Sequence, residues 1–324
     1  MQTILIATDF SAAAQNATNY GFALARTLQA KVILLNSHFY SNVFPDATAL
    51  VALAESEECS EKQLEAAVEV YDPNRTVKLE MVRSPAPVID SILQIVKSNT
   101  VSYIIAGMKE KGKEMRKVFG STVTALINES RVPIIVVPEK APVVIPQKIA
   151  LSSNLNNEQI IDIVRPLKKL VEQVGSKLYI VTVVDRFMSE PFEVLMKCSK
   201  ADWFLRSVNP VHEFIQDDKI GEAVISFANK NAVNMIAVIA HPHTLLERIF
   251  NSTLSQYFCF HSPIPLLVLP SVAADKQKIS AAAAAYCSGN CLVDNGTPKC
   301  NKYQQMHYEY EQEVNKETTN KVAG

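Results

Sequence analysis

Glycine is scarce in this sequence, and neither sign of charge is in excess. Nine of the 324 residues are glycine, less than half of the share of about 7% that is usual in proteins. Lys and Arg number 32 against 33 Asp and Glu. Without a positive excess we expect no general nucleic-acid binding, which requires a broad basic surface. With 48% hydrophobic and 20% charged residues, a wholly disordered, low-complexity or collagen-like chain is excluded.

Long apolar runs are also missing. No run approaches the roughly 18–20 residues of a membrane span, and residues 1–9 carry no basic segment of the kind that begins a secretory signal. We therefore expect no membrane association and a cytoplasmic location. Cys59, Cys198 and Cys259 stand singly, as free thiols usually do.

Two clusters could in principle hold a metal. Cys287, Cys291 and Cys300, with His307 beyond them, could bind zinc, form a disulfide or remain free thiols. The pair of histidines at 241 and 243 could ligate a metal or could simply shape a His-Pro-His turn. The cysteine cluster lacks a Cys-x-x-Cys pair, and the histidine pair lacks further acidic partners. We therefore predict no metal site.

The chain contains an internal repeat. Residues 102–138 and 234–270 share an apolar strand, a polar loop, an Arg-to-Phe segment followed by Gly-Ser-Thr or Asn-Ser-Thr, a short helix, and four aliphatic residues between two prolines. We predict one domain over 1–140 and a second, degenerate copy over 147–271, joined by a linker rich in Pro and Val. Residues 272–324 form a polar tail, expected to be a helix or a flexible extension.

Strands and helices are expected to alternate within each copy. In the first copy the strands are expected at 3–8, 31–36, 77–82, 101–106 and 134–137, with helices at 12–28, 87–98 and 121–128. In the second they are expected at 149–152, 177–184, 235–240 and 266–269, with helices at 157–174 and 220–231. Segments 39–70 and 185–207 are less periodic and are expected to hold helices. Strands that are apolar on both faces and separated by helices predict α/β domains, each a doubly wound parallel sheet.

The few glycines gather in one place. Gly107, Gly112 and Gly120 fall within fourteen positions, and Gly120 precedes Ser121 and Thr122 at the start of an expected helix. Glycine lets the backbone approach a ligand closely, and a helix N-terminus favours phosphate. Five Lys or Arg against two Glu lie between these glycines. The pattern predicts a phosphate-binding loop, although the glycines could also serve only to make turns.

The segments 4–11, 107–121 and 132–138 resemble the universal stress protein family, in a tandem form that covers residues 1–271. The resemblance implies a nucleotide α-hydrolase-like fold and binding of ATP or AMP. It implies that Asp9 bonds the adenine, that Ser37 borders this ring and that Gly107 borders the ribose. By position, the candidate binding residues are Ala7, Thr8, Asp9, Ser37, Ala106, Gly107, Gly112, Gly120, Ser121 and Thr122.

This sequence departs from the family pattern at two places. Glu110 stands at the middle glycine position of the first copy, and Gly112 comes two residues later. The second copy has Asn154 in place of Asp9 and Asn251 in place of Gly120, with no glycine in its loop. We therefore expect any nucleotide to bind in the first copy only, while the second is structural.

The resemblance implies a stress-response module that senses adenine nucleotide or binds a protein partner. A slow ATP-hydrolysing enzyme and a scaffold without nucleotide are the alternatives, and no catalytic residues are recognisable. The resemblance also implies that the two copies pair internally through strands 134–137 and 266–269, and a further homodimer is possible.

Overall fold

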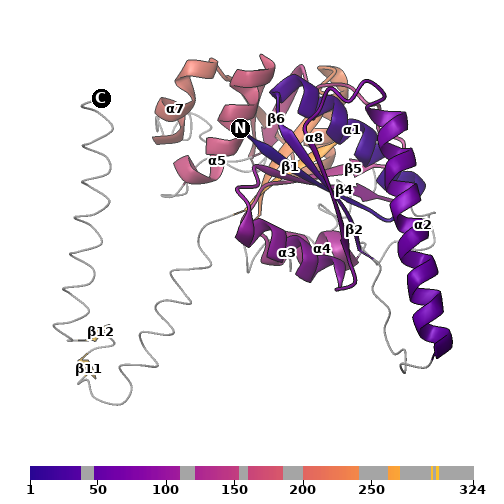
Figure 1. The fold of residues 1–324 in the computed structure, drawn as a ribbon. Helices are drawn as coiled ribbons and strands as arrows, with labels where there is room; N and C mark the ends of the chain where they lie inside the picture. Colours follow the sequence, from indigo (N-terminus) through magenta and orange to yellow (C-terminus); the bar gives the residue numbers. More distant parts are fainter. Residues whose placement is uncertain are drawn as a thin grey trace, which may run out of the picture. The chain divides into compact units, whose positions relative to one another are not determined.

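The computed structural model describes residues 1–37, 47–109, 121–152, 160–184, 200–240, 262–270, 293–294 and 297–298 (Figure 1). The chain divides into two compact units, Met1–Val272 and Ala273–Gly324. In the second unit, the described residues form two short antiparallel strands, β11 (Val293–Asp294) and β12 (Thr297–Pro298). The rest of the expected tail lies outside the described residues, as do the cysteines at 287, 291 and 300.

The first half of the larger unit is a parallel sheet with the strand order β3-β2-β1-β4-β5. The helices that connect these strands lie on both faces of the sheet (Figure 1). The strands are β1 (Thr3–Thr8), β2 (Lys31–Ser37), β3 (Leu79–Ser84), β4 (Tyr103–Met108) and β5 (Ile134–Pro138). The helices are α1 (Ala12–Leu28), α2 (Ala47–Tyr71), α3 (Val88–Ser98) and α4 (Ser121–Glu129).

The second half repeats this strand order in the opposite direction. Its strands continue the same ten-stranded sheet as β10-β9-β6-β7-β8, so that the order reads symmetrically outward from its centre. These strands are β6 (Lys148–Ser152), β7 (Lys177–Val184), β8 (Val211–Gln216), β9 (Met235–Ala240) and β10 (Leu266–Pro270). They are connected by α5 (Ile160–Val174), α7 (Lys200–Leu205), the 3-10 turn η1 (Arg206–Val208) and α8 (Ile220–Lys230).

The two halves join at the centre of the sheet. β5 and β10 pair antiparallel, with Ile135 opposite Leu267, whereas the other strand pairs of this sheet are parallel. This confirms the predicted contact between the two Pro-bounded aliphatic strands. The pairing makes one continuous sheet, so the two halves belong to one compact unit.

Two apolar layers cover the sheet, one on each face. Alternate strand residues such as Ile4, Ile6, Val32 and Leu34 pack beneath α1, α2, α5 and α7. The residues between them, such as Leu5 and Ile33, pack beneath α3, α4 and α8. Strands buried on both faces are the reason that the sequence shows continuous apolar runs here.

Several expected boundaries are corrected by the structure. β3 and β4 begin and end two residues later than predicted, and α2 occupies most of the segment for which only weak helical periodicity was visible. The strand β8 was missed, because its sequence mixes His212 and Glu213 with apolar residues and lies at the sheet edge. An edge strand with half-exposed faces lacks the apolar signature of a central strand.

Candidate functional site

The candidate site lies where the order of the first-half strands reverses. From β1 the chain passes through α1 to β2 on one side, whereas β4 lies on the other side of β1. In open α/β sheets, ligands bind at such a switch point, outside the carboxyl ends of the strands. The carboxyl ends of β1, β2 and β4 bring Asp9, Ser37 and Gly107 to this one edge. The predicted site residues of these three strands are thus brought together.

On the sheet face that α1 and α2 cover, the side chains of β1 and β2 change from apolar to polar toward this edge. Ile4 and Ile6 precede Thr8 along β1, and Val32 and Leu34 precede Asn36 along β2, all on one face of the sheet. Thr8 and Asn36 lie opposite each other in the register. The Asn36 side-chain amide donates to the carbonyl oxygen of Thr8 at 2.8 Å, and both residues are buried.

A tight turn follows β1 and leads into α1. The backbone N–H of Phe10 donates to Thr8 Oγ1 at 3.1 Å, and that of Ser11 donates to Asp9 Oδ1 at 3.0 Å. Phe10 has a positive φ of 59°, a conformation that non-glycine residues adopt rarely. Ser11 then caps α1 by accepting from the N–H of Ala14. Asp9 is exposed, so its carboxylate stands at the edge while one oxygen holds the turn.

Three serines form hydrogen bonds at the neighbouring corner between β2, β3 and α3. Ser37 Oγ donates to the carbonyl of Ala86 at 2.7 Å. The hydroxyls of Ser91 and Ser84 lie 2.7 Å apart, and Ser84 Oγ also accepts from the N–H of Ala86. Ser37 therefore has a structural role in addition to the predicted one beside a ligand ring. Sequence reasoning missed Ser84 and Ser91, because their connection with Ser37 depends on the strand order.

Gly107 is required by helix packing. A Cβ at this position would lie 2.7 Å from the backbone nitrogen of Ala14, and closer still to the carbonyl group of Ala13. The first turn of α1 thus rests directly on the backbone of β4. The sequence predicted a close approach of a ligand at Gly107, whereas in the structure the approaching group is the α1 backbone.

The opposite face of the edge is lined by small residues. Ala7 and Ala106 are partners across β1 and β4, and both are buried. α4 follows β4 and precedes the parallel strand β5, so its N-terminus, with Ser121 and the half-buried Thr122, points to the carboxyl edge. A helix N-terminus favours an anion, because its first N–H groups have no acceptor within the helix. The predicted loop residues Glu110, Gly112 and Gly120 lie outside the described residues.

The corresponding edge of the second half is built from different residues. By register, Thr182 occupies the position of Asn36, Ser152 that of Ala7, and Ile239 that of Gly107. Thr182 and Ile239 are both buried. The residues at 154, 241, 243 and 251 lie outside the described residues.

Both clusters that the sequence offers for a metal lie outside the described residues. In the part of the chain that the structure describes, no group of three or more His, Cys, Asp and Glu side chains could hold an ion. His212 on β8 faces Asp202 on α7 at 3.4 Å. Of the described helices, none is both long and apolar enough to cross a membrane.

The first half carries a recognisable family signature. Residues 1–138 match the Universal stress protein family. The matched segment contains β1 to β5, hence the whole candidate site. Residues beyond 138, where the second half begins, are outside the match, and no curated protein sequence matches the chain.

Solved structures resemble a larger part of the chain. A universal stress protein from Archaeoglobus fulgidus DSM 4304 is 14% identical and covers 83% of this chain and 98% of its own, with a TM-score of 0.62. A functionally unknown protein from Pseudomonas aeruginosa PAO1 is 10% identical and covers 87% and 98%, with a TM-score of 0.54. At these identities the likeness shows the α/β fold with its mainly parallel sheet. A universal stress protein in complex with cAMP covers 39% of this chain at 12% identity and a TM-score of 0.31, which adds nothing to that assignment.

Proposed function

We propose that this chain is a tandem universal stress protein whose first half binds adenine nucleotide, ATP or AMP, as a stress-response sensor. The observation that carries the proposal is the polar turn after β1 at the switch point of a universal stress protein domain. A ligand at this edge would meet the exposed carboxylate of Asp9 on one side and the N-terminus of α4 on the other.

The chemistry of the two sides suits the two ends of a nucleotide. A carboxylate accepts hydrogen bonds and therefore suits the exocyclic amine of adenine. The N–H groups at the start of α4 suit phosphate, and Thr122 adds a hydroxyl donor. Ala7 and Ala106 lie beside each other on β1 and β4 at this edge, and both have short side chains.

The second half is proposed to be a degenerate universal stress protein domain with a structural role. Its strand order and its antiparallel pairing with β5 support a duplicated fold that pairs internally. Ile239 places a large side chain where the first half has Gly107. We propose that this pairing takes the place of a dimer, and that the chain acts in the cytoplasm together with a protein partner.

The test is a calorimetric titration of the full chain with ATP, combined with mass spectrometry of any ligand retained after purification. We expect one nucleotide per chain and no release of phosphate. Phosphate release would favour the alternative of a slow hydrolase. An empty protein that is unaffected by millimolar ATP would favour a scaffold without nucleotide and overturn the proposal.

A further inference from the structure

A buried chain of hydrogen bonds links the candidate site to helix α2. The Asn36 amide donates to the Thr8 carbonyl at 2.8 Å, and Asn36 Oδ1 accepts from Ser60 Oγ of α2 at 2.7 Å. Thr8, Asn36 and Ser60 are all at most 7% exposed. Both functional groups of the Asn36 side chain are thus used, one toward β1 and one toward α2.

Asn36 and Ser60 are polar residues among apolar neighbours. The same face of β2 is otherwise filled by Val32 and Leu34, and the same stripe of α2 by Leu64 and Val68, spaced four and eight residues after Ser60. Burying an amide and a hydroxyl among such residues is unfavourable unless their hydrogen bonds are satisfied. The second half also carries a polar residue here, Thr182, at the position of Asn36.

The Thr8 carbonyl is the acceptor through which Asn36 acts on the site. This carbonyl belongs to the peptide group that joins Thr8 to Asp9, so fixing its oxygen also fixes the plane that carries the Asp9 N–H. Asp9 in turn holds the N–H of Ser11, the N-cap of α1. The direction in which Asp9 leaves the strand therefore depends on Asn36, and Asn36 is held by Ser60.

We propose that Asn36 is a positioning residue for Asp9, and that through Ser60 the docking of α2 and the binding of adenine nucleotide are coupled. This inference rests on the proposed nucleotide site and adds a mode of regulation to it. Because such coupling is reciprocal, nucleotide should hold α2 more firmly against the sheet. Any change that loosens α2 near Ser60 should weaken nucleotide binding.

The same helix offers a matched control at its other end. Thr76 Oγ1 donates to Asp72 Oδ1 at 2.6 Å just after α2 ends, in the segment that leads into β3. Since the chain enters β3 at this point, the contact lies at the amino edge of the sheet, away from Asp9. Thr76→Val removes one hydrogen bond from the anchoring of α2 without touching Asn36.

The experiment compares Asn36→Thr, Ser60→Ala and Thr76→Val with the unchanged full chain. Asn36→Thr introduces the residue that the second half carries at this position, which favours correct folding. We expect Asn36→Thr to weaken ATP binding by roughly tenfold and Ser60→Ala by about threefold, the size of one hydrogen bond or less. Thr76→Val should lower the urea midpoint and leave ATP affinity unchanged.

Amide hydrogen exchange supplies a readout that does not depend on ligand. Without nucleotide, Asn36→Thr should speed exchange at Phe10 and Ser11, whereas Thr76→Val should not. With ATP, exchange of the α2 amides around Ser60 should slow in the unchanged chain. If Asn36→Thr loses stability but keeps both ATP affinity and turn protection, the positioning role is wrong.

The experiment distinguishes failure of the proposed nucleotide binding from failure of the proposed coupling to α2. An unchanged chain that does not bind ATP overturns the proposed function and the coupling with it, while exchange at Phe10 and Ser11 still decides whether Asn36 holds the turn. An unchanged chain that binds ATP, together with variants that bind it equally well, overturns only the inference about Asn36 and α2.

Discussion

The two halves of the large unit have the same strand order but different residues at the ends of their strands. Both present apolar residues along the inner strands, and both end their last strand in proline, Pro138 and Pro270. At the carboxyl edge, Asn36 faces Thr8 in the first half, whereas Thr182 takes the corresponding place in the second. The two halves keep apolar residues at the strand positions that only fill the core. They differ at the carboxyl edge, where one polar group forms a specific hydrogen bond.

The start of the first helix in each half shows the same contrast. α1 begins four residues after β1 and rests on Gly107 through Ala13 and Ala14. Gly107 has no side chain, and the backbone of α1 lies directly against it. In the second half, Ile239 places a buried side chain at the corresponding position.

The largest effect is expected from Gly107→Val. Its Cβ would collide with the backbone of Ala13 and Ala14, which cannot move without displacing α1. Forcing an extra side chain into such a contact costs typically 1–3 kcal/mol, occasionally more, and we expect a loss of about 3 kcal/mol in the free energy of unfolding. Urea unfolding followed by circular dichroism measures this.

Ile239→Val is the matched change in the second half. It removes one buried methyl group and should cost about 1 kcal/mol, without displacing a helix. Equal losses from the two variants would show that Gly107 and Ile239 occupy equivalent environments and would contradict the asymmetry argued above.

Much of the fold could be predicted from the sequence, because it is recorded in local patterns. The apolar runs of β1, β4 and β5 identify central strands, and the resemblance to the universal stress protein family predicts that β5 and β10 pair. The partners of Gly107 and Asn36 could not be predicted in this way. Ala13 contributes only backbone atoms to its contact. Ser60 lies on α2, where the described side chains, residues 59–71, bury the narrow stripe of Ser60, Leu64 and Val68, and a narrow apolar stripe gives a weak helical period.

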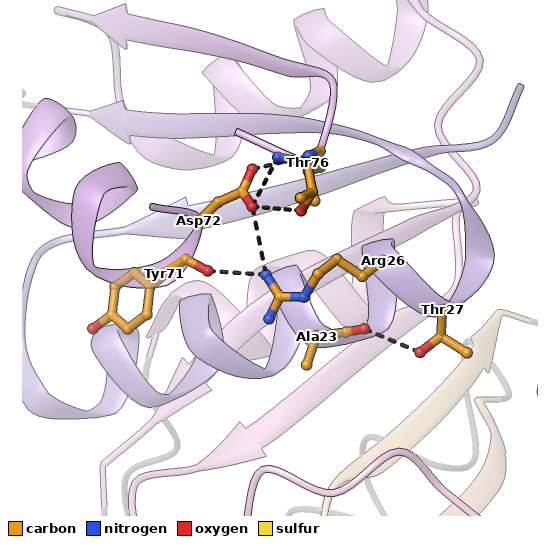
Figure 2. A network of polar contacts seen from close by, with 7 residues as sticks. Ala23, Arg26, Thr27, Tyr71, Asp72 and Thr76 are labelled. Carbon is orange, nitrogen blue, oxygen red and sulfur yellow. Dashed lines mark hydrogen bonds and ion pairs between the residues drawn. The ribbon is translucent and has the colours of Figure 1, made fainter. Parts of the chain in front are cut away.

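A second prediction concerns the anchor of α2, shown in Figure 2. Arg26 donates to the carbonyl of Tyr71 at 2.9 Å and lies 3.8 Å from Asp72, which also accepts from Thr76 and from the N–H of Val77. Burial raises the Asp72 pKa, but these hydrogen bonds and Arg26 together outweigh it and lower the pKa. Asp72→Asn should cost about 2 kcal/mol at neutral pH, because hydrogen bonds to a charged acceptor are lost.

The sign of the pH dependence follows from the lowered pKa. The contribution of Asp72 is fully present above the pKa of an unfolded Asp, about 3.9. It is lost as pH falls through the lower pKa of the folded state. The difference in unfolding free energy between the unchanged chain and Asp72→Asn should therefore narrow below about pH 4, and a constant difference down to pH 2 would contradict this.

The equivalent position in the second half provides the contrast. Glu172 of α5 stands where α1 has Arg26, is half exposed, and accepts from Ser207 Oγ at 3.1 Å. Exposed polar contacts of this kind contribute little. Glu172→Gln should change stability by less than about 0.5 kcal/mol.

A third prediction tests the asymmetry through binding. Asp9→Ala should weaken ATP binding by about 1 kcal/mol, one hydrogen bond, whereas Asn154→Ala in the second half should leave it unchanged. Calorimetric titration of both variants measures the affinity and the number of sites. A stoichiometry near two, or equal losses from both substitutions, would show that the second half also binds nucleotide.

The last prediction concerns two buried tyrosines of the first half. Tyr103 on β4 donates its hydroxyl to the carbonyl of Pro166 in α5 at 2.8 Å, across the join between the halves. Met235 takes its place in the second half and offers no such donor. Tyr20 is fully buried, and among the described residues its hydroxyl has no hydrogen-bond partner. Burial raises the pKa of both hydroxyls, so both remain protonated at neutral pH.

The two Tyr→Phe substitutions should therefore act in opposite directions. Tyr103→Phe removes the hydrogen bond to the carbonyl of Pro166. The substitution should therefore destabilise the chain by about 1 kcal/mol. Tyr20→Phe removes a hydroxyl that gains nothing from its surroundings and should stabilise by about 0.5 kcal/mol or leave stability unchanged. The urea midpoints of the two variants, measured under the same conditions, test whether the two substitutions act in opposite directions. A loss from Tyr20→Phe as large as that from Tyr103→Phe would mean that a bound water satisfies the Tyr20 hydroxyl, and it would contradict the expected difference between the two tyrosines.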